Sequence, residues 1–241
     1  MKTIIITGAS GGIGRAVAGR FIAAGWRAGL LARREAELRE IAAGTDAVVL
    51  PCDVTDADQV AAAFERFAAE AGRLDVLFNN AGIFTPPGMI DEISLDDWNR
   101  AVAVNQTGMF LCARAAFGRM RRQQPQGGRI INNGSVSASM PREGAVTYTM
   151  TKHAISGLTK QLALDGRAFD IACGQIDIGN ARTEMVEALI AREQAAGRPV
   201  PFTMDVGLVA DAVLRMAELP PEANVLFQTI MATKMPLVGR G

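Results

Sequence analysis

Short apolar runs alternate with longer amphipathic segments along this chain. The apolar runs lie at residues 4–7, 28–32, 47–50, 74–79, 129–132, 171–176 and 225–231. Segments of helical composition and spacing lie at residues 12–24, 34–41, 57–71, 95–122, 148–168, 181–196 and 206–218. Strands that alternate with helices in this way form βαβ units around a parallel sheet. The pattern predicts one doubly wound, Rossmann-type α/β domain over residues 1–241, with a seven-stranded parallel sheet flanked by helices.

The composition supports a globular protein and gives no sign of a nucleic-acid partner. The chain has 241 residues, of which 49% are hydrophobic and 21% charged, so a large core is possible and extensive disorder is excluded. Its 25 basic and 25 acidic side chains balance to a net charge of zero. A protein that binds DNA or RNA through phosphates usually carries an excess of basic residues.

Side chains suited to acid–base or metal chemistry are scarce. The chain has one histidine, His153, which excludes a zinc site built on several histidines, and we expect no metal. Its three cysteines are far apart and are expected to be buried, reduced thiols. No uncharged stretch approaches the length of a membrane span. We therefore expect a soluble, cytoplasmic protein with no membrane partner.

A glycine-rich segment, TGASGGIG at residues 7–14, joins the first strand to the first helix. In a parallel α/β sheet this is where a nucleotide binds, because glycines admit the phosphates and the helix N-terminus offers free N–H groups. A tight strand-to-helix turn without a ligand would also use glycines. The residues expected to contact the nucleotide here are Gly8, Ser10, Gly12, Ile13 and Gly14.

Further motifs follow the glycine turn in a fixed order. They are Asp53, the sequence NNAG at 79–82, Asn105, Ser135 and the pair Tyr148 and Lys152. Ser135 precedes Tyr148 by thirteen positions. In these motifs and their order the whole chain resembles the short-chain dehydrogenase/reductase family, in its short single-domain branch. The resemblance implies strand order 3-2-1-4-5-6-7 and hydride transfer between a nicotinamide cofactor and a carbonyl or secondary alcohol.

The predicted catalytic residues are Asn105, Ser135, Tyr148 and Lys152. Tyr148 and Lys152 are four residues apart, so they share a helix face, and the ammonium is expected to lower the tyrosine pKa from its usual ~10. By the resemblance, Tyr148 exchanges the proton, Ser135 holds the substrate oxygen, and Lys152 also binds the nicotinamide ribose. Asn105 corresponds to a residue beside a water that links the lysine to solvent. An ordinary amphipathic tyrosine is the alternative, and His153 is expected to serve packing or a subunit contact.

Two arginines, Arg33 and Arg34, follow the second strand, where the family selects its cofactor. An acidic residue there selects NAD, and a basic one accommodates the 2′-phosphate of NADP. We therefore expect NADP(H) rather than NAD, with Arg33 the stronger candidate, although the two arginines could merely begin an exposed helix. The resemblance also assigns Asp53, Val54, Asn80, Ala81, Gly82, Ile178 and Thr183 to the cofactor site, together with Tyr148 and Lys152. Asp53 is expected at the adenine amino group rather than as a helix cap, for which Thr55 and Asp56 are better placed.

Two segments depart from the family pattern. Ile178 replaces the usual proline before Gly179, and the sequence NNGS at 132–135 replaces the more usual serine pair. The substrate is expected to meet residues 84–89, residues 137–143 and a lid at about 180–203. These segments mix apolar and charged side chains, which suits a ketone, an acyl thioester or a ring substrate equally well.

The leading hypothesis is an NADP(H)-dependent alcohol dehydrogenase or carbonyl reductase. A 3-oxoacyl thioester reductase is the alternative within the enzymes, and the arginines at 119, 121, 122 and 129 would suit an acyl carrier unless they form a solvated helix end. A catalytically idle NADP(H)-binding sensor or scaffold is the alternative of another class. The resemblance also implies a homo-oligomer, a dimer or a tetramer, with apolar contacts near Phe117, Leu158 and Leu162.

Overall fold

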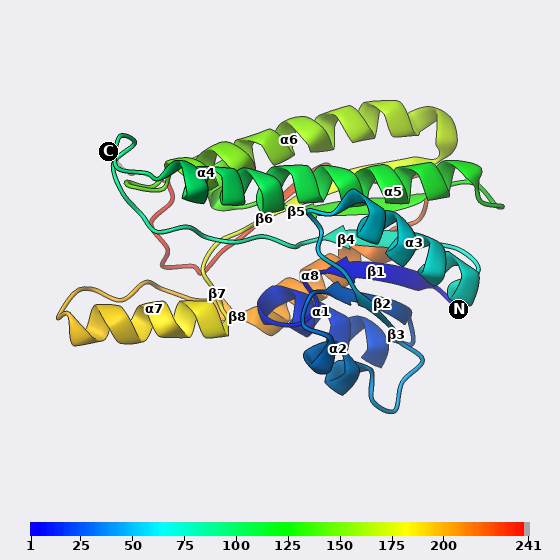
Figure 1. Cartoon of the computed structure of the whole chain (residues 1–241), viewed down its shortest axis with the longest axis horizontal. Coiled ribbons are helices and arrows are strands. Elements are labelled where there is room, and N and C mark those ends of the chain that lie inside the picture. The colour runs from blue at the N-terminus through cyan, green and yellow to red at the C-terminus, as the bar shows by residue number, and fades with distance from the viewer. Residues whose placement is uncertain (239–241) are drawn as a thin grey trace.

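The computed structural model describes residues 1–238, apart from the side chains of Met185, Leu189 and Arg192. It contains a parallel sheet in the order β3-β2-β1-β4-β5-β6-β9 (Figure 1). The strands are β1 (Thr3–Thr7), β2 (Arg27–Ala32), β3 (Val48–Pro51), β4 (Val76–Asn79), β5 (Gly128–Asn133), β6 (Ile171–Ile178) and β9 (Phe227–Ile230). The predicted seven-stranded sheet and its strand order are confirmed, with β9 as the seventh strand.

Helices cover both faces of the sheet (Figure 1). One face packs against α1 (Gly12–Ala23), α2 (Glu35–Ala42) and α8 (Val206–Glu218), through buried side chains such as Phe21, Leu38 and Val213. The other face packs against α3 (Ala57–Ala71), α5 (Met109–Arg122) and α6 (Val146–Gly166), with Phe67 and Cys112 in its core. Helices cover the interior strands on both faces, so side chains on both faces are buried. This explains the continuous apolar runs in the sequence.

The long helix predicted at 95–122 is interrupted. It consists of α4 (Leu95–Val102), a π-helical turn (Ala103–Gly108) and α5. The side chain of Asn105 leaves this turn to bond the backbone of Ile83, a contact between distant segments that periodicity does not reveal. Such π-helical turns are frequent at functional sites.

The helix predicted at 181–196 begins later than expected. Ala181–Arg182 forms a short strand, β7, which pairs in parallel with β8 (Met204–Asp205), and α7 covers Glu184–Ala195. The small β7-β8 sheet ties the two ends of the predicted lid together. Within residues 1–238, no helix is long and apolar enough to cross a membrane.

Candidate active site

The glycine turn between β1 and α1 has a backbone that only small residues permit. Gly8 adopts φ +69°, in the left-handed region, and a Cβ on Gly14 would lie 2.2 Å from the Gly8 carbonyl oxygen. The N-cap of α1 is Gly11, which provides no side-chain hydrogen bond to the first N–H groups of the helix. A close-packed turn with an uncapped helix N-terminus fits the phosphates of a dinucleotide.

The two arginines after β2 point to different partners. Arg34 lies over the glycine turn, with Nη2 3.1 Å from the Ser10 carbonyl oxygen and 3.2 Å from Ser10 Oγ. Arg33 faces Asp53 instead, with Nη1 4.0 Å from Asp53 Oδ2. Of the two arginines, Arg34 is therefore the one that lies against the glycine turn.

The segment after β3 separates the roles of two aspartates. Asp53 Oδ1 accepts hydrogen bonds from the backbone N–H and the hydroxyl of Thr55, at 3.0 and 2.8 Å. Asp56 is the N-cap of α3 and accepts from the backbone of Asp58 and Gln59. As expected, Asp53 does not cap the helix. Val54 is buried and packs where a Cβ on Gly108 would stand, 2.7 Å from Val54 Cγ2.

The NNAG segment after β4 is locked to β1 and β5. Thr7 Oγ1 accepts from the backbone N–H groups of Asn80 and Ala81, at 2.7 and 2.9 Å. The Asn80 amide donates to the Thr7 carbonyl at 2.8 Å and accepts from Asn133 Nδ2 at 2.7 Å. Because both ends of the amide are used, Asn80 shapes the cofactor face mainly by holding the loop. Gly82 lies under Asn105, whose Oδ1 would be 3.4 Å from an added Cβ.

The start of the lid meets the glycine turn. Thr183 Cγ2 would lie 3.6 Å from a Cβ on Gly12, so residues far apart in sequence face each other across the predicted nicotinamide end. Ile178 is buried at the end of β6 and belongs to the core. Ile13 is partly buried against the same core.

The predicted catalytic side chains meet between β5 and α6. Lys152 is 3% exposed, donates from Nζ to the Asn133 carbonyl at 2.7 Å, and lies 5.5 Å from the centroid of the Tyr148 ring. Ser135 follows β5 and hydrogen-bonds the Tyr148 side chain. Asn105 lies in the π-helical turn before α5. Its amide donates to the Ile83 carbonyl and, at 3.4 Å, to the hydroxyl of Thr151, the residue before Lys152. His153 is exposed, and its Nδ1 donates to the Thr149 carbonyl in the same helix, at 2.9 Å.

Burial dominates the electrostatics of this group. It raises the pKa of Tyr148, against the opposing effects of the Ser135 hydrogen bond and the Arg142 charge. The net shift of the Tyr148 pKa is therefore upward, whereas the sequence suggested a lowered pKa. Phe84 stacks on the Tyr148 ring at a centroid distance of 4.1 Å, which helps to exclude water. Burial also lowers the pKa of Lys152 from 10.5 to about 8, with the Asp177 charge working against it.

Sequence reasoning missed Asp177, a carboxylate near the end of β6. Its Oδ1 accepts from the Ser135 backbone N–H at 2.9 Å and from Gln175 Nε2 at 2.7 Å. The only signal in the sequence is a polar pair, Gln175 and Asp177, within an otherwise apolar strand.

The segments expected to line the substrate site converge near Tyr148. Thr85 and Thr147 share a hydrogen bond of 2.7 Å between their hydroxyls, which joins the loop after β4 to the start of α6. Arg142 donates from Nη2 to Asn180 Oδ1 at 3.1 Å, which joins the loop before α6 to the lid. The three expected segments are thus adjacent in space.

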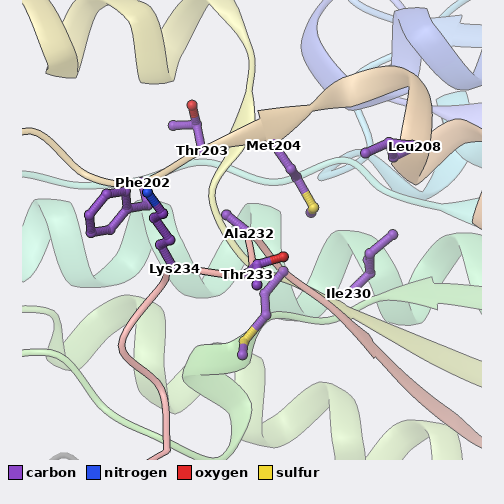
Figure 2. A pocket seen from close by; sticks show the side chains of 9 residues that line it. Phe202, Thr203, Met204, Leu208, Ile230, Ala232, Thr233 and Lys234 are labelled. Atoms are coloured by element: carbon purple, nitrogen blue, oxygen red, sulfur yellow. The ribbon is translucent and has the colours of Figure 1, made fainter.

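A cavity of about 350 Å³ lies between the end of the lid and the segment after β9 (Figure 2). Its lining residues are Phe202, Thr203, Met204, Leu208, Ile230, Met231, Ala232, Thr233 and Lys234. The Lys234 ammonium stands 5.9 Å from the centroid of the Phe202 ring, at one side of the cavity. None of the four predicted catalytic residues lines it, so this cavity is separate from the group around Tyr148.

Comparisons with known proteins agree with this arrangement. The family model described as "short chain dehydrogenase" matches residues 2–194, which include every predicted site residue. A 3beta-hydroxysteroid dehydrogenase of Mediterraneibacter gnavus is 35% identical over 77% of this chain and 68% of its own. A 3-oxoacyl-[acyl-carrier-protein] reductase of Staphylococcus aureus is 34% identical over 78% of both chains.

Solved structures show the same fold. A serine dehydrogenase complexed with NADP+ has a TM-score of 0.89 and 25% identity, over 99% of this chain and 98% of its own. A 3-ketoacyl-(acyl-carrier-protein) reductase from Brucella melitensis, complexed with NADH, has a TM-score of 0.87 and 24% identity, over 96% and 97%. The chain belongs to the short-chain dehydrogenase/reductase family of NAD(P)-dependent oxidoreductases, which confirms the prediction from its motifs.

Proposed function

We propose that this oxidoreductase interconverts a carbonyl and a secondary alcohol with NADP(H), and that Tyr148 is its acid–base residue. The observation that carries the proposal is the meeting of Ser135, Tyr148 and Lys152 at the carboxyl edge of the sheet, next to the uncapped helix N-terminus of the glycine turn. Ligands of open α/β sheets bind at this edge.

Each residue has a distinct part in the proposed reaction. The bound cofactor supplies or accepts the hydride. In reduction the Tyr148 hydroxyl donates its proton to the carbonyl oxygen, while the Ser135 hydroxyl hydrogen-bonds that oxygen. Lys152 supplies a positive charge behind the tyrosine ring and a donor for the ribose. The Asn105 amide holds the π-helical turn against Ile83 and Thr151, and so fixes the backbone next to Lys152.

The preference for NADP(H) is supported by Arg34. Its guanidinium covers Ser10 in the glycine turn, where a 2′-phosphate and an arginine could form a charge-assisted pair. Relatives of known structure bind NADP+ in one case and NADH in another, so the arginine and not the family is the reason for the proposal.

An apolar carbonyl compound is the proposed substrate class. Phe84, which stacks on Tyr148, is more than 45% exposed, and so is Met140 in the loop before α6. Relatives named for a hydroxysteroid and for a 3-oxoacyl thioester are compatible with such a site. The arginines considered for an acyl carrier give little support to a 3-oxoacyl thioester as the substrate. Arg129 is buried and donates to the carbonyl of Ala223 at 2.8 Å. It also lies at the start of β5, whereas Ser135 follows the end of that strand.

A catalytically idle sensor is the less favoured function, because Ser135, Tyr148 and Lys152 are all retained in contact. We further propose that the chain is one domain with a substrate lid at about 180–203, that it acts in the cytoplasm, and that it assembles as a homo-oligomer. The pairing of β7 with β8 supports the lid, because it fixes both ends of that segment.

Turnover with and without the Tyr148 hydroxyl tests the proposal. NADPH and NADH oxidation are followed against cyclic ketones, steroid ketones and 3-oxoacyl thioesters. We expect turnover with NADPH and a fall in kcat of roughly 100-fold or more in Tyr148→Phe, since general acid catalysis contributes that much. The matched control is His153→Gln, one residue beyond Lys152 on an exposed side, which should keep its rate. Equal turnover in Tyr148→Phe and the wild type would refute the assignment, and binding of NADPH without any turnover would favour the sensor.

A further inference from the structure

Asp177 is a charged group inside the site for which the proposed reaction has no part. It lies on β6, one residue beyond the last register pair between β5 and β6, and its carboxylate turns toward the loop that carries Ser135. A Cβ on Gly134 would stand 2.1 Å from Asp177 Oδ1 and 2.6 Å from Gln175 Nε2. Only glycine at 134 leaves room for this carboxylate. Gly134 and Asp177 are therefore parts of one arrangement.

A chain of buried hydrogen bonds holds Asp177 in place. Gln175 is fully buried and donates to Asp177 Oδ1 and to Ser156 Oγ, at 2.7 and 3.0 Å. It accepts from Thr159 at 3.1 Å, and Thr159 accepts in turn from Asn132 at 2.9 Å. The carboxylate thus has a fixed position between β6, β5 and α6. A polar network of this kind is rigid when its members are satisfied.

The titratable groups around Asp177 lie on α6 and in the loop before it. Lys152 and Tyr148 face it from α6, and Arg142 faces Tyr148 from the loop before α6. On β9, the other neighbour of β6, the residue opposite Asp177 is Thr229, which does not titrate. Burial raises the pKa of Asp177, and the Lys152 charge opposes this effect. The Asp177 charge in turn raises the pKa of both Lys152 and Tyr148.

We propose that Asp177 is a positioning residue for the reaction. Its carboxylate holds Ser135 by accepting from the Ser135 backbone N–H, and it offsets the charge of Lys152 next to Tyr148. This inference rests on the proposed role of Tyr148. With Asp177 ionised, Lys152 favours the phenolate less than it would alone, so Tyr148 stays protonated over a wider range of pH. A protonated tyrosine is the form that donates to a carbonyl, and Asp177 therefore extends to higher pH the range in which the site can reduce one.

Tyr148 is the only tyrosine of the chain, so its ionisation can be read directly from phenolate absorbance without any substrate. We expect Asp177→Asn to lower the midpoint of this titration by ~1 pH unit, as removal of a nearby like charge does. Asp177→Ala should lower it equally, because it removes the same charge. The matched control is Asp165→Asn on the exposed end of α6, seventeen residues from Tyr148 and roughly 25 Å along the helix. It should leave the midpoint unchanged, since that distance exceeds the screening length.

Turnover then separates the two roles of Asp177. Asparagine can still accept the Ser135 N–H bond and alanine cannot, so we expect kcat to fall ~10-fold further in Asp177→Ala than in Asp177→Asn. The pH at which reduction declines should shift down in both. Tyr148→Phe supplies the absorbance blank, and far-UV circular dichroism identifies a variant that has not folded. If the wild type and both variants titrate at the same pH, the inference is wrong. The titration stands even if Tyr148→Phe keeps its activity, which would overturn the proposed function alone.

Discussion

Lys152 keeps a charged side chain where water is nearly excluded. It is 3% exposed, and its ammonium donates a hydrogen bond to the Asn133 carbonyl, a neutral acceptor. Burial therefore makes the charged form costly, and the pKa falls to about 8. A buried lysine therefore lowers the stability of the folded chain. Such a loss of stability is common where a residue is kept for function.

The pH dependence of stability should reveal this cost. Below pH 8 Lys152 is protonated in both the folded and the unfolded chain. Between pH 8 and 10.5 the unfolded chain binds more protons, so the lysine's contribution to stability rises with pH. We expect the wild type to gain ~2 kcal/mol in free energy of unfolding relative to Lys152→Met between pH 7 and 10. Urea denaturation at several pH values measures it.

The matched control for this titration is Lys160→Met, on the same helix but exposed. Its free energy of unfolding should follow that of the wild type across the same pH range. A constant difference between the wild type and Lys152→Met would contradict the lowered pKa.

At the scale of elements, the glycine turn and the start of α2 act together. Arg34, the N-cap residue of α2, reaches across to Ser10 and is itself 3.2 Å from Glu37 Oε1. Arg33, one residue earlier, turns toward Asp53 instead. Two neighbouring arginines of equal charge thus face different parts of the predicted cofactor site.

Arg34→Ala and Arg33→Ala test this difference as a matched pair. We expect KM for NADPH to rise ~10-fold or more in Arg34→Ala, because a hydrogen bond to a charged group contributes about 1.5–3 kcal/mol. KM for NADH should change little, since NADH lacks the 2′-phosphate, and Arg33→Ala should have the smaller effect. Steady-state kinetics with both cofactors measures this. A larger effect of Arg33→Ala would return the assignment to that residue.

Elements built from local periodicity could be predicted, and elements built from distant contacts could not. The helices at 57–71 and 206–218 have the predicted bounds, because their apolar faces follow the helical period. The π-helical turn around Asn105 depends on Ile83, and β7 depends on β8, twenty-three residues later. The raised pKa of Tyr148 had the same origin: the lysine is visible in the sequence, but the burial and the stacking of Phe84 are not.

At the scale of the whole molecule, α5 and α6 lie side by side on one face of the sheet (Figure 1). Of the residues expected to contact a partner, Phe117 and Leu162 pack against the core, and Leu158 remains at the surface. Leu158 lines a hollow of about 250 Å³ together with Gln106, Thr107, Phe110, Ala154 and Ile155. Of the large apolar side chains that line it, Phe110 is the exposed one, at 51%.

A second copy of the chain is the proposed occupant of this face, since a two-fold axis would place Phe110 of each subunit near the hollow of the other. We expect the wild type to be a dimer or tetramer, and Phe110→Arg to dissociate it at least one step, because two buried charges would face each other. Size-exclusion chromatography with light scattering measures the mass. Ile90→Arg, on the loop between β4 and α4 and 76% exposed, is the matched control and should keep the wild-type mass. A monomeric wild type would exclude the assembly. An unchanged mass in Phe110→Arg would place the subunit contact elsewhere.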